Sequence, residues 1–166
     1  MERTVTNPKI VTRLIPLVLL PVAVGIISAA LTGDAMLAYG HMNQPAFAPP
    51  TIVFPIAWTI LYILMGLGSY FLFMTYPANQ KQESNKRTAL LIYFIQLVFN
   101  FTWSLFFFNA HLYFFAFAWL MVLWLMIIAL IVKSAAVSFK ATVLFIPYLI
   151  WCIFAAYLNL MVAILN

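Results

Sequence analysis

Five long stretches without a charged residue dominate this chain of 166 residues and limit what it can fold into. Each stretch reaches the roughly 17 to 25 apolar residues that a helix needs to cross a lipid bilayer. Only 7% of the residues are charged, whereas a soluble globular domain usually has about a quarter. The chain is therefore expected to be an integral membrane protein. The stretches cover residues 14–31, 53–76, 89–108, 112–132 and 141–165.

The predicted fold is all-α, a bundle of five transmembrane helices that forms a single domain over residues 1–166. A chain of this length leaves no room for a second domain. The longest connection, residues 32–50, is predicted to be a loop and a candidate lid, because long loops are often functional. We predict helices at about residues 10–31, 51–76, 87–108, 112–133 and 140–165.

The basic residues predict the orientation of the bundle. With five spans, residues 3–13, 81–87 and 133–140 fall on the same side, and these regions hold all eight Lys and Arg. The positive-inside rule then places the N-terminus in the cytoplasm and the C-terminus outside. The net charge of +5 is explained by this topology and by anionic lipid headgroups. We therefore predict the lipid bilayer, and no nucleic acid, as a partner.

The composition argues against several kinds of active site. No Asp, Glu, Lys or Arg lies inside the five stretches, although ion-coupled transporters depend on intramembrane ionisable groups. The acids are Glu2, Asp34 and Glu83, so neither paired carboxylates nor a catalytic triad can be assembled. The two histidines, His41 and His111, are predicted to be solvated loop residues rather than metal or haem ligands. We predict no metal site and no required cofactor.

Amide side chains predict an inward-facing polar stripe on the third helix. Gln96, Asn100 and Trp103 recur there at helical spacing. Amides in lipid need hydrogen-bond partners, which neighbouring helices supply, so the stripe should face the bundle interior. Asn159 on the last helix is a candidate partner for the two amides. Bonding between helices and binding of a ligand both stay open as roles for this stripe.

Flat aromatic side chains on the second and last helices predict an apolar pocket between them. Trp58 and Tyr62 recur at helical spacing on the second helix, as Trp151 and Phe154 do on the last. Such side chains suit stacking against a flat, apolar ligand that a few amide or indole donors would orient. Packing between helices and anchoring at the membrane interface are the alternative roles.

Three blocks of spaced residues carry a resemblance to a known family. They are Phe47-Ala48-Pro49-Pro50 followed by Phe54-Pro55-x-x-Trp58-x-x-x-Tyr62-x-x-Met65-Gly66, Tyr93-x-x-Gln96-x-x-x-Asn100-x-x-Trp103-Ser104-x-x-Phe107, and Ile146-Pro147-Tyr148-x-x-Trp151-x-x-Phe154-Ala155-x-x-Leu158-Asn159. They resemble, in order, the motifs of the TspO/MBR family, the tryptophan-rich sensory proteins whose animal members are called translocator protein or peripheral benzodiazepine receptor. The resemblance covers the chain from about residue 46 to its end.

The resemblance implies a five-helix membrane protein that binds porphyrins and other tetrapyrroles of the haem pathway in a pocket beneath the first loop. Animal members of the family also bind cholesterol and benzodiazepine-site drugs. Porphyrin or haem is thus expected here as a ligand rather than as a cofactor. The predicted ligand-binding residues combine the aromatic stripes with positions that match the family's pocket: Phe47, Pro49, Trp58, Tyr62, Asn100, Trp103, Trp151, Phe154, Ala155 and Leu158.

The chain departs from the family's pattern at three positions. Phe47 stands where the loop motif often has tryptophan, and Trp119 stands where many members carry an acidic residue in the fourth helix. Tyr157 is not followed by the Lys or Arg of the animal sterol-associated pattern, which was a weak pattern to begin with. The pattern therefore gives no support for cholesterol recognition of that kind.

Three functions follow as hypotheses. The first is a tetrapyrrole-binding protein that acts as a sensor, carrier or scavenger. The second is an enzyme-like activity in which light and oxygen degrade the bound porphyrin, with Trp58 and Trp151 as the candidate catalytic residues. The third is a structural or interaction protein whose aromatic side chains only pack.

Assembly and location are further expectations. Gly25 and Ala29 form a small-x-x-x-small pair, and Gly66, Gly68 and Ser69 offer another face that lets helices approach closely. Packing within one chain and dimerisation both explain such faces, and the family resemblance favours a homodimer. The N-terminus is unlike a transit peptide, so a bacterial inner membrane is the expected default location.

Overall fold

The computed structural model describes residues 8–166, except for the side chains of residues 8–11, 13 and 34–38. This part of the chain is helical and contains no strand. Its elements are α1 (Pro8–Tyr39), α2 (Val53–Met74), α3 (Gln80–Ser104), the π-helical turn η1 (Leu105–Asn109), α4 (Tyr113–Ala135) and α5 (Phe139–Leu165). Five segments, one in each α-helix, are long and apolar enough to cross a membrane. The predicted five-helix membrane bundle is thereby confirmed.

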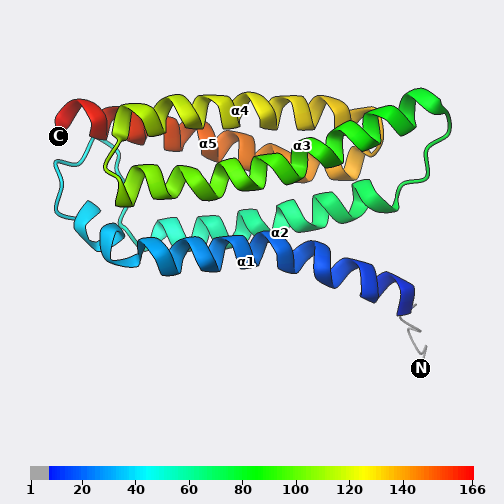
Figure 1. Ribbon diagram of the computed structural model, residues 1–166, viewed down its shortest axis with the longest axis horizontal. Helices are drawn as coiled ribbons and strands as arrows, with labels where there is room; N and C mark the ends of the chain where they lie inside the picture. The colour runs from blue at the N-terminus through cyan, green and yellow to red at the C-terminus, as the bar shows by residue number, and fades with distance from the viewer. Residues whose placement is uncertain (1–7) are drawn as a thin grey trace.

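The helices run along one long axis, and α1 lies at an edge of the bundle (Figure 1). It packs on α2, α3 and η1, whereas α5 packs on α2 and α4, and α4 packs on α3. Only 11% of the spanning segment of α1 is buried inside the bundle, compared with 28% to 44% in the other four. The first helix is therefore the one held least tightly by its neighbours.

The first helix continues eight residues beyond its predicted end at residue 31. The first connection consequently covers residues 40–52, and the predicted start of the loop at residue 32 is wrong. Gly33 and Asp34 suggested a loop, but a glycine inside a helix costs only about 1 kcal/mol relative to alanine. The four residues that follow Asp34 are Ala, Met, Leu and Ala, which are strong helix formers.

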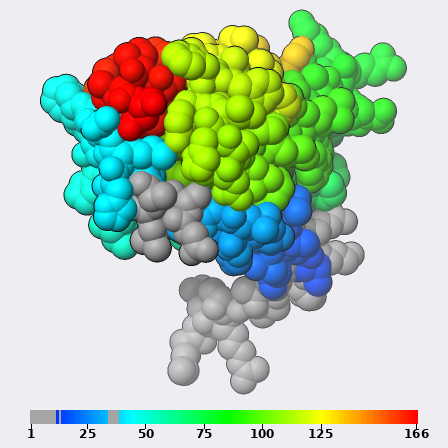
Figure 2. All heavy atoms as spheres, turned by 60° about the vertical axis from the view of Figure 1, so that its left-hand side comes forward, coloured from blue at the N-terminus to red at the C-terminus, as the bar shows by residue number. Residues whose placement is uncertain are grey.

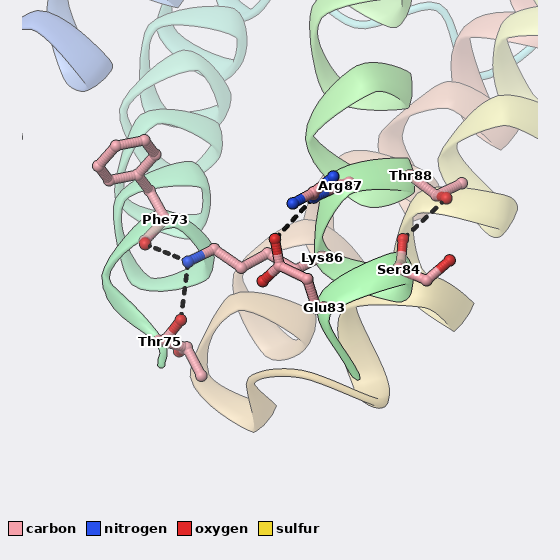
Figure 3. A network of polar contacts seen from close by, with 7 residues as sticks. All are labelled: Phe73, Thr75, Glu83, Ser84, Lys86, Arg87 and Thr88. Atoms are coloured by element: carbon pink, nitrogen blue, oxygen red, sulfur yellow. Dashed lines mark hydrogen bonds and ion pairs between the residues drawn. The ribbon is translucent and has the colours of Figure 1, made fainter. Parts of the chain in front are cut away.

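The third helix begins at Gln80, seven residues before its predicted start. Asn79 Oδ1 accepts a hydrogen bond of 2.9 Å from the Gln82 amide, and Gln82 Oε1 accepts one of 2.6 Å from the Ala78 amide. Together these bonds satisfy two amides that would otherwise lack partners at a helix start. An exposed ion pair of 2.6 Å between Glu83 and Arg87, one helical turn apart, follows the cap (Figure 3). The polar segment is therefore a capped helix rather than a loop.

The same end of the bundle collects positive charge. Lys86 Nζ donates to the carbonyl oxygens of Phe73 and Thr75, at 2.7 and 2.8 Å (Figure 3). A cation at this place satisfies the last carbonyls of α2 and is favoured by the helix dipole. The ends of α2 and α4 and the starts of α3 and α5 lie together here (Figure 1), so all five basic residues from Lys81 onward lie at one end. This segregation is what the orientation prediction requires.

Cysteine labelling tests the orientation. We expect a cysteine at His41→Cys, in the first loop, to react with a membrane-impermeant thiol reagent added outside the cell. A cysteine at Ser84→Cys, at the basic end, should react only when the cytoplasmic side is opened. The native Cys152 is buried, so the unmodified protein is the background control. The opposite labelling pattern would overturn the charge argument.

Small residues let the helices of one chain approach closely. A Cβ atom on Gly66 would lie 2.6 Å from the Val18 Cα atom, and one on Gly25 would lie 2.3 Å from the Tyr62 ring. Real side chains do not tolerate such distances, so both glycines are needed where α1 meets α2. Gly25 and Gly66, which suggested dimerisation, thus pack within the bundle, and the homodimer stays a prediction of the family resemblance.

Candidate ligand-binding site

Two neighbouring cavities lie in the half of the bundle away from the basic end. We call the smaller one, of about 30 Å³, the aromatic chamber. The larger one, of about 410 Å³, lies between α1, α2 and α3, and we call it the lateral cavity. Trp58, Trp103 and Phe108 line both, so they form the wall that the cavities share. The aromatic residues of the chamber that carry the argument below are Tyr39, Phe54, Trp58, Trp103, Phe107 and Trp151.

Trp58 stands at the centre of the aromatic side chains. Its ring lies 5.6 Å from that of Tyr62 in a stacked arrangement and 6.4 Å from that of Trp151, edge to face. The rings of Trp103 and Tyr148 lie 6.3 and 6.2 Å away. These are the separations at which aromatic rings attract one another beyond their burial. One side chain of α2 thereby joins α3 and α5.

A chain of buried hydrogen bonds lies beneath this cluster. The Tyr62 hydroxyl donates to Asn100 Oδ1 at 2.6 Å, and Asn100 Nδ2 donates to the Tyr148 hydroxyl at 3.1 Å. The Tyr148 hydroxyl in turn donates to Gln96 Oε1 at 2.9 Å. The predicted polar stripe thus faces inward and bonds α3 to α2 and α5. Low local polarity strengthens such bonds and makes a missing partner costly.

Asn159 has a different partner from the one predicted. Its Oδ1 accepts a 3.1 Å hydrogen bond from Trp103 Nε1, and its Nδ2 donates to the Tyr113 carbonyl at 2.8 Å. The prediction that Asn159 bonds Gln96 and Asn100 is wrong, because the tyrosine hydroxyls occupy those amides. The Trp103 indole N–H is therefore already paired and is not available to a ligand.

Two donors in the aromatic chamber lack a protein acceptor. Within the described part of the chain, the Tyr39 hydroxyl and the Trp151 indole N–H are buried without a hydrogen-bond partner, and both residues line the chamber. Burial raises the pKa of Tyr39 above its ordinary value, which keeps the hydroxyl protonated as a donor. An unpaired buried donor costs about 1 to 3 kcal/mol, so each calls for an explanation. An acceptor atom on a bound ligand would supply one.

The π-helical turn shapes one side of the chamber. The Ala110 amide donates to the Leu105 carbonyl at 2.9 Å, five residues back rather than four. Single π turns are frequently found at functional sites. Phe107 lines the chamber and Phe108 lines both cavities, so the turn presents two consecutive phenylalanines to this region.

The amino-acid sequence is similar to those of known proteins. The model of the TspO/MBR family matches residues 17–165. The chain belongs to the TspO/MBR family. A tryptophan-rich sensory protein of Cereibacter sphaeroides is 38% identical over 121 residues, which are 73% of this chain and 72% of that protein. The tryptophan-rich protein TspO of Chlorobaculum tepidum is 34% identical over 145 residues, 87% of this chain and 89% of the relative.

An animal relative matches as well. The translocator protein of Ovis aries is 32% identical over 129 residues, which are 78% of this chain and 75% of that protein. The TspO/MBR resemblance that the three sequence blocks indicated is thus confirmed. This chain is a multi-pass membrane protein of that family, with its five spans in place.

The structure brings half of the predicted site residues of this TspO/MBR protein together at the chamber. They are Trp58, Trp103, Trp151, Ala155 and Leu158. Tyr62 and Asn100 line the lateral cavity instead. Helical spacing explains the last helix, where Ala155 and Leu158 follow Trp151 by four and seven residues and share its face. Whether they contact a ligand stays a prediction.

Three predicted residues line neither cavity. Phe47 is 87% exposed, with a φ of 66°, in a turn closed by a 3.1 Å bond from the Ala48 amide to the Pro45 carbonyl. Phe154 lies outside both linings, with its ring 5.7 Å from that of Trp151. The third is Pro49, in the same loop as Phe47. Phe47 and Pro49 were predicted from the loop motif alone, and a motif does not determine the direction in which a loop side chain points.

Two further residues of this TspO/MBR protein differ from what the sequence suggested: one lines the chamber without having been predicted, and the other lies away from both cavities. Tyr39 was missed because the first helix was expected to end eight residues earlier. Trp119, which the resemblance aligned with an acidic residue of many members, donates its indole N–H to the Phe99 carbonyl at 3.1 Å. Its ring stacks on that of Phe99 at 4.3 Å. It lines neither cavity and fastens α4 to α3.

The first loop is fastened to the end of α5. Residues 40–53 connect two wall residues of the chamber, Tyr39 and Phe54. The Asn43 amide donates to Asn166 Oδ1 at 3.0 Å, and Asn166 Nδ2 donates back to the Asn43 carbonyl at 3.2 Å. The Tyr157 hydroxyl donates to the Ala46 carbonyl at 2.7 Å. Figure 2 shows the loop, in cyan, beside the end of α5, in red.

Removing one of these bonds should loosen the loop. For Tyr157→Phe we expect amide hydrogen exchange in residues 41–48 to speed up about two- to fivefold, because one exposed hydrogen bond contributes roughly 0.5 to 1 kcal/mol. The matched control is Tyr76→Phe, which changes a tyrosine that is 87% exposed at the opposite end. Equal exchange in the two variants would show that the loop is held by other contacts.

Proposed function

We propose that this protein binds a tetrapyrrole such as a porphyrin, or another flat apolar ligand, in the aromatic chamber, and that it acts as a sensor, carrier or scavenger. The observation that carries the proposal is the pair of buried, unpaired donors, the Tyr39 hydroxyl and Trp151 Nε1, among aromatic walls. A porphyrin has a large flat face for stacking and carboxylates that accept hydrogen bonds. Relatives named as sensory and translocator proteins support the sensing and carrying roles.

The volume of the chamber sets a condition on binding. At about 30 Å³ it is far smaller than the 300 to 1,000 Å³ of typical ligand pockets. Turning the side chains of the shared wall, Trp58 and Trp103, would join it to the lateral cavity of about 410 Å³. Ligand binding therefore requires a rearrangement of this wall. Slow association, limited by that step, is the kinetic sign to look for.

A titration with protoporphyrin tests the proposal. The absorbance of the ligand should shift and the tryptophan fluorescence should fall saturably, because the indoles of the chamber would lie beside the absorbing ring. For Trp151→Phe we expect affinity to fall about fivefold, or roughly 1 kcal/mol, because the ring face stays and the unpaired N–H donor is lost. Stability should fall only by the packing lost with the smaller ring, since that N–H has no protein partner.

The chain offers a matched control for this variant. Trp124 also carries a buried indole N–H without a partner, and it lines neither cavity. Trp124→Phe should therefore bind protoporphyrin like the parent. An absence of any spectral shift in the parent would favour the structural role, in which the aromatics only pack. Equal affinities of parent and Trp151→Phe would refute the donor role of Trp151.

The contact between Trp58 and Trp151 favours a second candidate function. Their rings lie 6.4 Å apart on the walls of one chamber, so both indoles would lie near a porphyrin bound there. Light and oxygen would then degrade the porphyrin with these oxidisable indoles taking part. Under illumination in air, the bound porphyrin should bleach into a new absorbing species, and Trp58→Phe and Trp151→Phe should suppress bleaching even where binding survives. Bleaching that continues unchanged in both variants would exclude this role.

A further inference from the structure

The lateral cavity opens on the outer surface of the bundle, between α1 and α2. Ile26 at its rim is 65% exposed, and Ala29 and Thr59, on facing helices, are exposed as well. Its inner wall is buried, with Trp103 only 8% and Ser104 only 7% exposed. Every lining residue belongs to one of the candidate membrane spans. The opening therefore lies within the membrane-spanning part of the bundle.

The packing of α1 against α2 explains why a space remains there. Toward the basic end the two helices touch at backbone distance, where Gly66 meets Val18. One turn further from that end, Gly25 leaves room for the Tyr62 ring. Beyond these contacts, small side chains such as Ala29 face α2 across the cavity. The space thus begins where the close contact ends.

The chemistry of the lateral cavity differs from that of the aromatic chamber. No lining residue is charged, and none of the unpaired buried polar atoms found in the described residues belongs to it. Its hydroxyls bond within the protein: Ser28 Oγ and Ser104 Oγ lie 2.6 Å apart, and Thr32 Oγ1 donates to the Ser28 carbonyl at 2.9 Å. An uncharged lining whose hydroxyls already bond within the protein offers water few partners. It suits a hydrocarbon occupant.

We propose that the lateral cavity is a binding site for the hydrocarbon chain of a membrane lipid, which enters from the bilayer between α1 and α2 and ends against Trp58 and Trp103. Its volume of about 410 Å³ lies within the range of specific ligand pockets. The inference goes beyond the proposed function and does not depend on it. It also links the two sites, because the lipid chain lies on the wall that must turn when the chamber opens. A chain in the lateral cavity and a large ligand in the joined cavities therefore exclude each other.

Photocrosslinking in nanodiscs tests this site. The probe is a phosphatidylcholine with a diazirine near the end of one acyl chain, and the labelled residues are located by mass spectrometry. Lipids that surround the bundle reach Val98, which is 59% exposed on α3, but not Trp103 or Ser104. We expect label at Trp103 or Ser104 as well as at Val98, because only a chain inside the cavity reaches the buried pair.

Variants that fill the mouth of the cavity with a larger side chain should block entry of the lipid chain. In Ala29→Phe the label at Trp103 and Ser104 should be lost while the label at Val98 stays. Ile27→Phe is the control, since Ile27 is 53% exposed on the same helix and does not line the cavity. Thr59→Phe fills the same mouth from α2. It is used in place of the Ala29→Phe variant if thermal unfolding shows that the latter is not folded.

Two results would overturn the lipid site. One is label at Val98 without any at Trp103 and Ser104 in the parent. The other is label at the buried pair that persists in the filled variant that is folded. The porphyrin titration is read separately on the same preparations. A parent that labels Trp103 and binds no porphyrin would refute the proposed function and leave the lipid site standing.

Discussion

Replacing Asn100 with leucine is expected to destabilise the bundle by about 2 kcal/mol, because it removes the centre of a buried hydrogen-bond chain. The Tyr62 hydroxyl would lose its acceptor and the Tyr148 hydroxyl would lose a donor. Asn100 is 3% exposed and Tyr148 is fully buried, so water cannot take the place of the amide. Unfolding in mixed micelles with increasing sodium dodecyl sulfate measures the change.

A double-mutant cycle separates the hydrogen bonds from the loss of packing. Tyr62→Phe removes only the hydroxyl that bonds Asn100. If the bond matters, the double variant Tyr62→Phe/Asn100→Leu should lose less stability than the sum of the two single variants, because no hydroxyl of Tyr62 is then left unpaired. Strictly additive losses would show that Asn100 acts through its volume alone.

Replacing Trp58 with alanine is expected to affect both stability and ligand binding. The ring is partly buried and contacts four other aromatic rings, and deleting a tryptophan that packs in a core costs up to about 3 to 5 kcal/mol. The variant also removes part of the wall between the two cavities. Protoporphyrin should therefore associate faster but bind at least about tenfold more weakly, since a stacking surface worth about 1.4 kcal/mol or more is lost.

Trp124→Ala is the control for this large deletion. Trp124 packs against the core from α4 and lines neither cavity. It should lose a comparable amount of stability while keeping its affinity for protoporphyrin, as a fluorescence titration of the folded fraction would show. If Trp58→Ala binds like Trp124→Ala, the chamber is not the ligand site.

The fold could be predicted because the constraints that determine it are visible along the chain. The lengths of the apolar stretches and the spacing of the basic residues predicted the number of spans, which the structure confirms. The ends of the helices were harder to predict, because each depends on one or two hydrogen bonds of individual side chains. The Asn79 and Gln82 cap was readable as a sequence signature but lay in a segment whose polarity suggested a loop.

The site was predictable where it follows helical spacing, and not where it depends on contacts between helices. Trp151, Ala155 and Leu158 share one face of a single helix, so the sequence brought them together. Gly25 shows the limit: its spacing to Ala29 suggested a dimer face, but the structure uses the glycine to admit the Tyr62 ring. The sequence does not distinguish these roles, because both require only a small side chain.

The π-helical turn makes the wall of the chamber depend on the number of residues and not only on their type. Bonding five residues back widens one turn, so the fourth and fifth residues after Trp103, Phe107 and Phe108, both reach the cavities. In a regular α-helix the fifth residue would point well away from the side of Trp103. Deleting one residue between Leu105 and Asn109 would thus keep every tryptophan and still remove a phenylalanine from the wall. Alignments of related chains should therefore be examined for gaps at this turn as closely as for substitutions of the tryptophans.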